Sequence, residues 1–317
     1  MKRNISILVG LCCLIAIGGS RVNGQAKAID FSSISRAEIE LLLADVAETN
    51  PKVVKQLAED PAMKKKQIED LRELLAFASQ AQRDGLAADP INKQELENIY
   101  AETLAVNYDR EINKGKAKMP AFGFITKDQV KAYWAAKETA GQRTHEAEFN
   151  DFLNAKIVIL RTSSPDLKDR EISKEEKDQS RDVFARIRIY RAEYDQKAKA
   201  GTLPKPLIDK ANLQVKLQQT QFLARLCSEK ITERSKATEA DIAKYIAAHP
   251  DDLTSSELPA RDYARNKIEK DNEERLTAEI VAANNIQVPD DFTVPVVPPK
   301  TVKKEPVPPK KPGTKRP

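Results

Sequence analysis

The sequence contains few glycines and aromatic residues, and very few histidines and cysteines. Its 317 residues include 10 Gly, 2 His and 3 Cys, and aromatic residues make up only 5%. This composition argues against an all-β sandwich, which needs many tight turns. Ala, Leu, Glu, Lys, Gln and Arg predominate instead, and these residues lose little conformational freedom on entering a helix. Because 40% of the residues are hydrophobic, a chain of this length can also bury a core. The sequence therefore predicts an all-α protein.

The scarcity of histidine leaves little room for metal or acid–base chemistry. The residue four positions after His145 is Phe149, so the paired-histidine zinc motif fails, and His249 precedes a proline at a predicted helix end, where we expect an exposed residue. No Cys/His cluster has the spacing of metal ligands. No nucleophile elbow, phosphate loop or dinucleotide fingerprint occurs. Paired carboxylates are common, but they fall at helical spacing among lysines, which is typical of solvated faces. We expect no catalytic residue, metal or cofactor, and the sequence favours a binding protein.

The net charge of +5 is concentrated at the two ends of the chain. Residues 1–24 hold three basic residues, and residues 295–317 hold seven basic residues and one acidic residue. Without these two segments, the 53 basic and 48 acidic residues fall to 43 and 47, which is a net charge of −4. A body with this charge is not typical of a nucleic-acid-binding protein.

The first residues have the layout of a secretory signal. Lys2 and Arg3 precede an apolar run over residues 5–17, which small and polar residues follow. We expect cleavage after Gly24, with Ala28 as the rival position, and an exported, periplasmic protein. An uncleaved N-terminal anchor remains the alternative.

Cleavage would remove two of the three cysteines. Cys12 and Cys13 lie inside the apolar run, too early for lipoprotein processing, so Cys227 would be the only cysteine left and no internal disulfide is expected. Cys227 falls in a strongly apolar helical pattern, which favours a buried core residue over a reactive thiol.

Four capping boxes and a set of helical patterns place the helices. In each box a hydroxyl residue precedes an acidic or amide residue by three positions, and the pairs are Ser35 and Glu38, Thr126 and Gln129, Ser173 and Glu176, and Thr238 and Asp241. Further apolar stripes predict long helices over residues 64–84 and 92–112, with Gly85 ending the first.

The most informative helix covers the stretch LIDKANLQVKLQQTQFLARLCSEKI. One apolar stripe comprises Ile208, Ala211, Val215, Phe222 and Leu226, and the roughly opposite stripe comprises Leu213, Leu217, Ala224 and Ile231. A helix with two apolar faces is sandwiched between packed layers. We expect it to be the spine of the domain.

A loop between two helices carries the candidate binding residues. The stretch GKAKMPAFGFIT contains proline, glycine and three large apolar residues, and two aromatic residues follow in the next helix. The candidates for contact with extended apolar segments are Met119, Phe122, Phe124, Tyr133 and Trp134. The alternative is that these side chains only pin the loop to the helices.

The last residues differ from the rest of the chain. Residues 295–317 contain eight prolines, one glycine and the clustered lysines Lys303, Lys304, Lys310 and Lys311. We expect an extended, disordered tail, either a basic tether to cell-wall polymer or an anionic membrane surface, or an ordinary solvated tail.

The stretch KATEADIAKYIAAHPDD resembles the segment that closes the N-terminal chaperone domain of SurA/PpiD/PrsA-type periplasmic foldases. The upstream helices, including ISRAEIELLLADV and LQVKLQQTQFLARLCSEKI, resemble the same domain, and the stretch ARNKIEKDNEERLTAEIVAANNIQVPDDFTVP resembles the end of such proteins. The resemblance covers roughly residues 29–295. It implies an ATP-independent chaperone, or holdase, for unfolded exported or outer-membrane proteins.

The chain departs from that family at one position. A parvulin prolyl-isomerase domain would need about a hundred residues, and the short stretch between His249 and Ala264 offers no room for it. We therefore expect a signal at 1–24, a helical chaperone domain at 25–250, a linker at 251–260, a helix with a short extension packing on the body at 261–294, and the tail at 295–317.

Three functions remain open at this point. The leading expectation is a holdase without enzymatic activity. One alternative is an envelope scaffolding protein tethered by its tail. The other is a protein that its family would class as a prolyl isomerase although the catalytic domain is not present.

Overall fold

The computed structural model describes residues 29–117, 119–136, 143–251 and 258–295, and helices dominate this part of the chain. Within it the regular structure consists of ten α-helices and two short 3-10 turns, without a strand, so the predicted all-α class is confirmed. The helices are α2 (Arg36–Thr49), α3 (Pro51–Glu59), α4 (Pro61–Arg83), α5 (Pro90–Ile112), α6 (Lys127–Ala135), α7 (His145–Ser163), α8 (Lys174–Lys199), α9 (Lys205–Ser235), α10 (Glu239–Ala248) and α12 (Ala260–Asn284). The predicted signal and almost all of the predicted tail lie outside the described residues.

The helix starts follow from local hydrogen bonding. All four predicted capping boxes form, at Ser35, Thr126, Ser173 and Thr238. Each hydroxyl accepts a bond from an amide of the first turn that has no partner within the helix. The two long helices α4 and α5 begin differently, with Asp60 and Asp89 as N-caps and a proline directly after each, and proline suits the first position of a helix.

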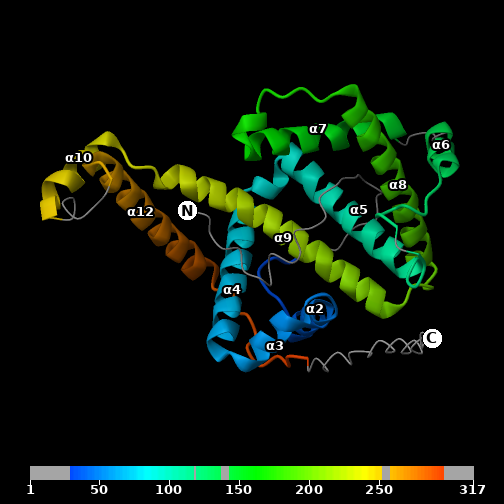
Figure 1. The fold of residues 1–317 in the computed structure, drawn as a ribbon, viewed down its shortest axis with the longest axis horizontal. Coiled ribbons are helices and arrows are strands. Elements are labelled where there is room, and N and C mark those ends of the chain that lie inside the picture. Colours follow the sequence, from blue (N-terminus) through cyan, green and yellow to red (C-terminus); the bar gives the residue numbers. More distant parts are fainter. Residues whose placement is uncertain (1–28, 118, 137–142, 252–257, 296–317) are drawn as a thin grey trace, which may run out of the picture.

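Helix α9 is the spine of the body, as its two apolar stripes predicted. It spans 31 residues, which makes it about 46 Å long, and it crosses the whole body (Figure 1). Ala211 and Val215 pack into a core shared with α5 and α8. Leu213 and Leu217 pack on the opposite side, with residues of α2 and α3. The helix is therefore buried on both faces.

The C-terminal half of α9 packs along α4. Phe77, Ala78 and Ala81 of α4 share a core with Leu223 and Cys227. Cys227 is 3% exposed, as predicted for a core residue. Burial raises the pKa of its thiol to about 11, so the thiol is protonated at neutral pH and is a poor nucleophile.

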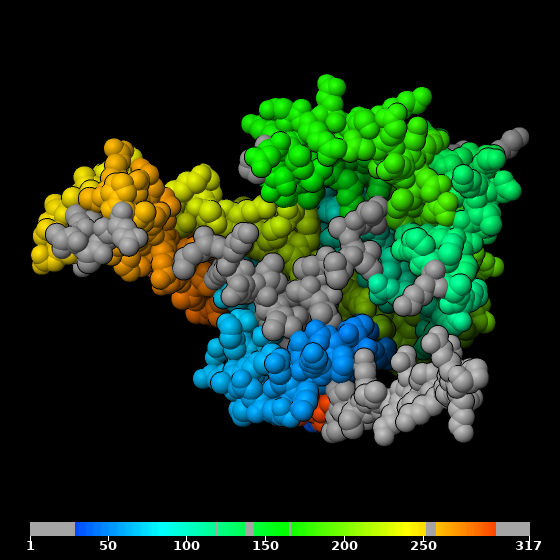
Figure 2. All heavy atoms as spheres, viewed as in Figure 1, coloured from blue at the N-terminus to red at the C-terminus, as the bar shows by residue number. Residues whose placement is uncertain are grey.

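Helices α10 and α12 form an arm that extends from the end of α9 (Figure 1). The space-filling view shows the arm projecting beyond the rest of the body (Figure 2). Arg261 of α12 pairs with Glu239 of α10, and the Asn272 side chain donates a hydrogen bond to the Ser235 carbonyl over 3.2 Å. Farther along, α12 returns to the body, where it contacts α4 and α9 and buries Leu276.

The joint between α10 and α12 is described only in part. The chain positions described on either side of it are Asp251 and Leu258, and residues 252–257 lie outside the described part. His249 is the exposed C-cap of α10, as expected from the proline that follows it.

A buried polar network joins α5 to α7 and corrects one prediction. Lys156 of α7 lies 2.7 Å from a carboxylate oxygen of Glu95 and 3.6 Å from one of Glu102. Asn98 donates to Glu95 over 3.0 Å. The assignment of the carboxylates to solvated faces is wrong for Glu95 and Glu102, which are 6% and 3% exposed. Their helix is covered by α7, α8 and α9, which the local spacing did not reveal.

Candidate functional site

A cleft of about 950 Å³ opens between α2, the segment that precedes it, and the N-terminal half of α9. Apolar and aromatic side chains line part of it, and they are Ile29, Ala37, Leu41, Tyr100, Pro206, Leu213 and Val215. Polar and charged side chains line the remainder, and they are Asp30, Glu38, Lys205, Asp209, Asn212 and Lys216. The cleft is thus a mixed surface, suited to a ligand that offers both apolar and polar groups.

Two sets of polar contacts hold α2 across α9 at the cleft wall. The Lys216 ammonium lies 2.9 Å from Glu38 Oε1. Farther along, the Gln214 side chain donates to Asp45 over 3.1 Å, and Lys210 also pairs with Asp45. Since residue numbers rise along α2 while they fall along α9, the two helices run antiparallel, and these contacts fix the position of one cleft wall relative to the other.

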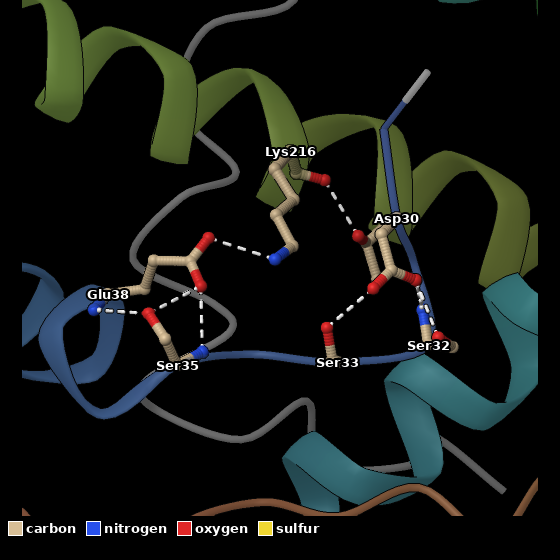
Figure 3. A network of polar contacts seen from close by, with 7 residues as sticks. Asp30, Ser32, Ser33, Ser35, Glu38 and Lys216 are labelled. Carbon is tan, nitrogen blue, oxygen red and sulfur yellow. Dashed lines mark hydrogen bonds and ion pairs between the residues drawn. The ribbon is translucent and has the colours of Figure 1, made fainter. Parts of the chain in front are cut away.

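The segment before α2 contributes a further fixed charge, that of Asp30 (Figure 3). The Asp30 carboxylate accepts bonds from the Ser32 amide over 2.8 Å and from the Ser33 hydroxyl over 2.6 Å. The hydroxyls of Ser32 and Ser33 lower the pKa of Asp30 to about 2. Burial alone would raise the pKa of Glu38, but bonds from Lys216 and Ser35 outweigh it and lower that pKa. Both carboxylates are therefore ionised at neutral pH.

A second, narrow pocket of about 30 Å³ lies on the other side of α2. Its lining is almost entirely apolar and includes Leu42 of α2, Leu71 of α4 and Leu217 of α9. Val288 and Phe292, which follow α12 in the chain, complete it. Helix α2 thus separates a wide mixed cleft from a narrow apolar pocket.

The predicted loop residues are not gathered on one open surface. Phe122 is 6% exposed and contacts the ring of Tyr190. Phe124 is half-buried, and the Lys116 ammonium lies 5.1 Å from its ring centre. Met119 is 51% exposed and is the most accessible of the five predicted residues.

Tyr133 and Trp134 belong to an aromatic cluster with α7 and α8. Trp134 stacks on Phe184, with ring centres 5.9 Å apart, and meets Phe149 edge-on at 6.0 Å. Tyr133 stacks on His145 at 4.2 Å. These contacts anchor α6 to the body. The binding role predicted for the five residues stays a prediction, and the predicted tether lysines Lys303, Lys304, Lys310 and Lys311 lie outside the described residues.

The loop before α6 is held by a specific set of hydrogen bonds. Phe122 has φ +62, a region that residues with large side chains rarely adopt. Its amide donates to Asp109 Oδ2 over 2.8 Å. Its carbonyl and that of Ile125 accept bonds from Arg186 over 3.0 Å and 2.6 Å. This support explains how the strained conformation persists.

Sequence reasoning did not find the α2–α9 cleft. One signal was present, because Lys210, Gln214 and Lys216 interrupt the apolar stripes of α9 and are the residues that reach α2. Their partners lie more than 160 positions away in the chain, so pairing them required the fold. Among the described residues no group of three or more His, Cys, Asp or Glu is placed to hold a metal ion, and no described helix is long and apolar enough to cross a membrane.

Comparison with known proteins adds no identification. No protein-family model matches the chain, and neither a curated protein nor a solved structure matches it. Its function is therefore inferred from its residues and geometry.

Proposed function

We propose that this protein is an ATP-independent chaperone, a holdase, that binds unfolded exported or outer-membrane polypeptides in the α2–α9 cleft. The observation that carries the proposal is the cleft itself, about 950 Å³ in volume and lined by both apolar and charged side chains. An unfolded segment exposes apolar side chains next to backbone groups that need hydrogen-bonding partners. A mixed lining matches that chemistry better than a purely apolar pocket does.

The charges at the cleft wall are fixed before any ligand arrives. Lys216, whose side chain is 13% exposed, pairs with Glu38, and Asp30 is held by the two serines that follow it. Groups that are already oriented lose little further freedom on binding. Lys205 and Asp209 at the cleft are paired with one another over 2.5 Å, and their side chains are 83% and 46% exposed, which leaves them accessible to a polar ligand.

The resemblance to the N-terminal chaperone domain of periplasmic foldases supports the same proposal. The stretches that carry it form α2, residues 213–231 of α9, α10, and most of α12 with the residues after it in this structure. Export, and hence a periplasmic location, rests on the predicted signal at residues 1–24.

An aggregation assay tests the proposed activity directly. An outer-membrane protein diluted from urea is expected to remain soluble in the presence of an equimolar amount of the protein without added ATP. If light scattering rises as fast as in its absence, the holdase proposal is wrong.

A blocking substitution tests the location. Ala37 is exposed and lines the cleft, so Ala37→Trp is expected to obstruct the cleft while the buried contacts of α2 remain. The matched control is Ala247→Trp, at an exposed position on α10 in the arm. Protection is expected to fall in the first variant and persist in the second. Equal protection by both variants would remove the cleft from the proposal.

The composition of the tail favours a second candidate function. Seven basic residues and eight prolines in residues 295–317 suit an extended tether to an anionic envelope surface. Deletion of these residues separates the two functions, because loss of envelope retention with full holdase activity would assign only tethering to the tail. The proposal includes no enzymatic activity, so a prolyl-isomerase assay is expected to give the background rate, and a higher rate would contradict this.

A further inference from the structure

The chain that follows α12 lies in a groove formed by α2 and α4. Asn285 adopts a left-handed conformation, φ 47 and ψ 45, and ends α12. Residues 286–294, which we call the strap, then run without helical structure. Gln287 forms a parallel bridge with Ser33, the one isolated bridge of the described residues.

Three apolar side chains fasten the strap. Ile286, Val288 and Phe292 are 2%, 8% and 7% exposed, and they share a core with Ile39 of α2 and Leu75 of α4. The neighbouring residues Gln287, Asp290, Asp291 and Thr293 are exposed. The strap therefore uses the pattern of a bound extended peptide, in which some side chains enter a groove while their neighbours face solvent.

The polar contacts of the strap are made at its exposed side. The Lys64 ammonium donates to the Asp290 carbonyl over 2.7 Å, and the Thr293 amide donates to Glu40 over 3.0 Å. Arg36 lies 3.3 Å from the Asp291 carboxylate, and both side chains are at least half exposed. An exposed ion pair of this kind adds little stability. The apolar pocket of about 30 Å³ beside Val288 and Phe292 is also incompletely filled.

We infer that the groove between α2 and α4 is a binding site for extended polypeptides with apolar side chains at positions 1, 3 and 7, and that the strap occupies it until such a ligand replaces it. The inference rests on the proposed function for the class of ligand, an unfolded polypeptide, and it adds a second site that the chain's own residues cover. Because the strap is tethered, it competes at a high effective concentration. A free peptide binds weakly unless the strap is loosened.

A reversible lock on the strap provides the test. Ser33 and Gln287 are exposed bridge partners, so Ser33→Cys with Gln287→Cys places two cysteines within disulfide reach. Cys12 and Cys13 are replaced by serine to prevent mispairing. The probe is the fluorescein-labelled peptide NIQVPDDFTV, the sequence of residues 285–294, and binding to the full chain is followed by anisotropy.

The reduced chain is expected to bind the peptide weakly but measurably, and oxidation is expected to weaken binding by about tenfold or more, since the locked strap cannot leave. A peptide with serine at its three apolar positions is expected not to bind. Equal binding by the oxidised and reduced chains would overturn the inference. Absence of binding to the reduced chain would also overturn it.

A second variant is designed to strengthen peptide binding, and a second peptide tests the pocket beside Val288. Phe292→Ala in the full chain removes one fastening residue and is expected to tighten peptide binding by about tenfold, because the competing strap is weaker. A probe with leucine in place of Val288 is expected to bind more tightly than the parent probe, since it fills the adjoining pocket. If Phe292→Ala binds the probe no better than the parent chain does, the strap is not the competitor and the inference is wrong.

The two proposals fail separately. If the peptide exchanges with the strap but the protein gives no protection against aggregation, the holdase proposal is wrong and the groove is still a peptide site. In the opposite case, the protein protects against aggregation, Ala37→Trp reduces this protection, the lock does not change it, and the probe does not bind. The cleft is then still the proposed binding site, and the groove inference is wrong.

Discussion

Replacing Lys156 by methionine should destabilise the protein more than any single surface change. Lys156 is the cation of the network between α5 and α7, where it lies 2.7 Å from Glu95 and 3.6 Å from Glu102. The side chains of the two glutamates are only 8% and 4% exposed. Burial alone would lower the pKa of Lys156, but the two carboxylates outweigh it and raise that pKa, so the ammonium is charged at neutral pH.

The magnitude follows from what the substitution leaves behind. Methionine preserves most of the aliphatic packing but leaves two buried carboxylates without their ammonium. Removal of one partner from a buried ion pair costs about 3 to 5 kcal/mol. Since the Lys156 side chain retains 25% exposure, water relieves part of the cost, and we expect a loss of about 3 kcal/mol in the free energy of unfolding.

The loss should also depend on pH. Without the lysine, one carboxylate is expected to take up a proton in the folded state, so that its pKa lies above the unfolded value. The folded state then binds more protons than the unfolded state does, and stability falls as pH rises through that interval. The variant should therefore be more destabilised at pH 8 than at pH 5. Adding Glu102→Gln should recover part of the lost stability, because it removes one of the two buried charges that no longer face the ammonium.

Urea denaturation followed by circular dichroism measures these differences. The matched control is Lys230→Met, because Lys230 pairs with Asp84 over 3.7 Å while both side chains are at least 33% exposed, and such a pair is worth about 1 kcal/mol or less. A loss below about 1 kcal/mol in Lys156→Met, or a loss unchanged between pH 5 and pH 8, would refute the buried-network reasoning.

Three further results are expected. Asp109→Ala removes the acceptor of the buried Phe122 amide and should lower the free energy of unfolding in urea by about 1 to 3 kcal/mol. Asp128→Ala, at an exposed site, should lower it by less than about 0.5 kcal/mol. Equal losses in the two variants would contradict the anchoring of the loop. The pKa of Asp30 is lowered to about 2, so the stability that its ionised carboxylate contributes is complete above pH 4 and is lost as the pH falls towards 2. Because Asp30 is largely exposed, the difference in unfolding free energy between wild type and Asp30→Asn should shrink by only about 1 kcal/mol across that interval. An increase in that difference on acidification would contradict the sign. Cys227, buried with its thiol pKa raised to about 11, should resist iodoacetamide at pH 8 by peptide mapping until urea is added, and rapid native labelling would contradict its burial.

Features set by neighbouring residues were predictable from the sequence. The boxes at Ser35, Thr126, Ser173 and Thr238 depend on residues three positions apart. The double-faced character of α9 depends on its own apolar stripes. In both cases the interaction that decides the structure is local, so the pattern was sufficient.

Features set by distant residues were not predictable. Glu95 and Glu102 had the same local setting as solvated glutamates, and only the docking of α7 beside α5 buries them. The left-handed conformation of Phe122 depends on Asp109 and Arg186, two residues outside its loop. The α2–α9 cleft likewise exists only once residues 30–41 meet residues 205–216.

The joint between α10 and α12 shows both situations. The sequence indicated a short connection with a helix after it that packs on the body, and α12 does contact α4 and α9. That α10 and α12 form an arm (Figure 1) was not indicated.

The central claim is that an unfolded polypeptide occupies the α2–α9 cleft, and site-specific crosslinking tests it most directly. A photoreactive benzoylphenylalanine at Asn212, which is exposed and lines the cleft, is compared with one at Ala247 on the arm. With an unfolded outer-membrane protein as ligand, we expect crosslinks from position 212 that a folded sample of the same ligand does not give. Crosslinks from position 247 alone, or equal crosslinking of folded and unfolded ligand at position 212, would contradict the account.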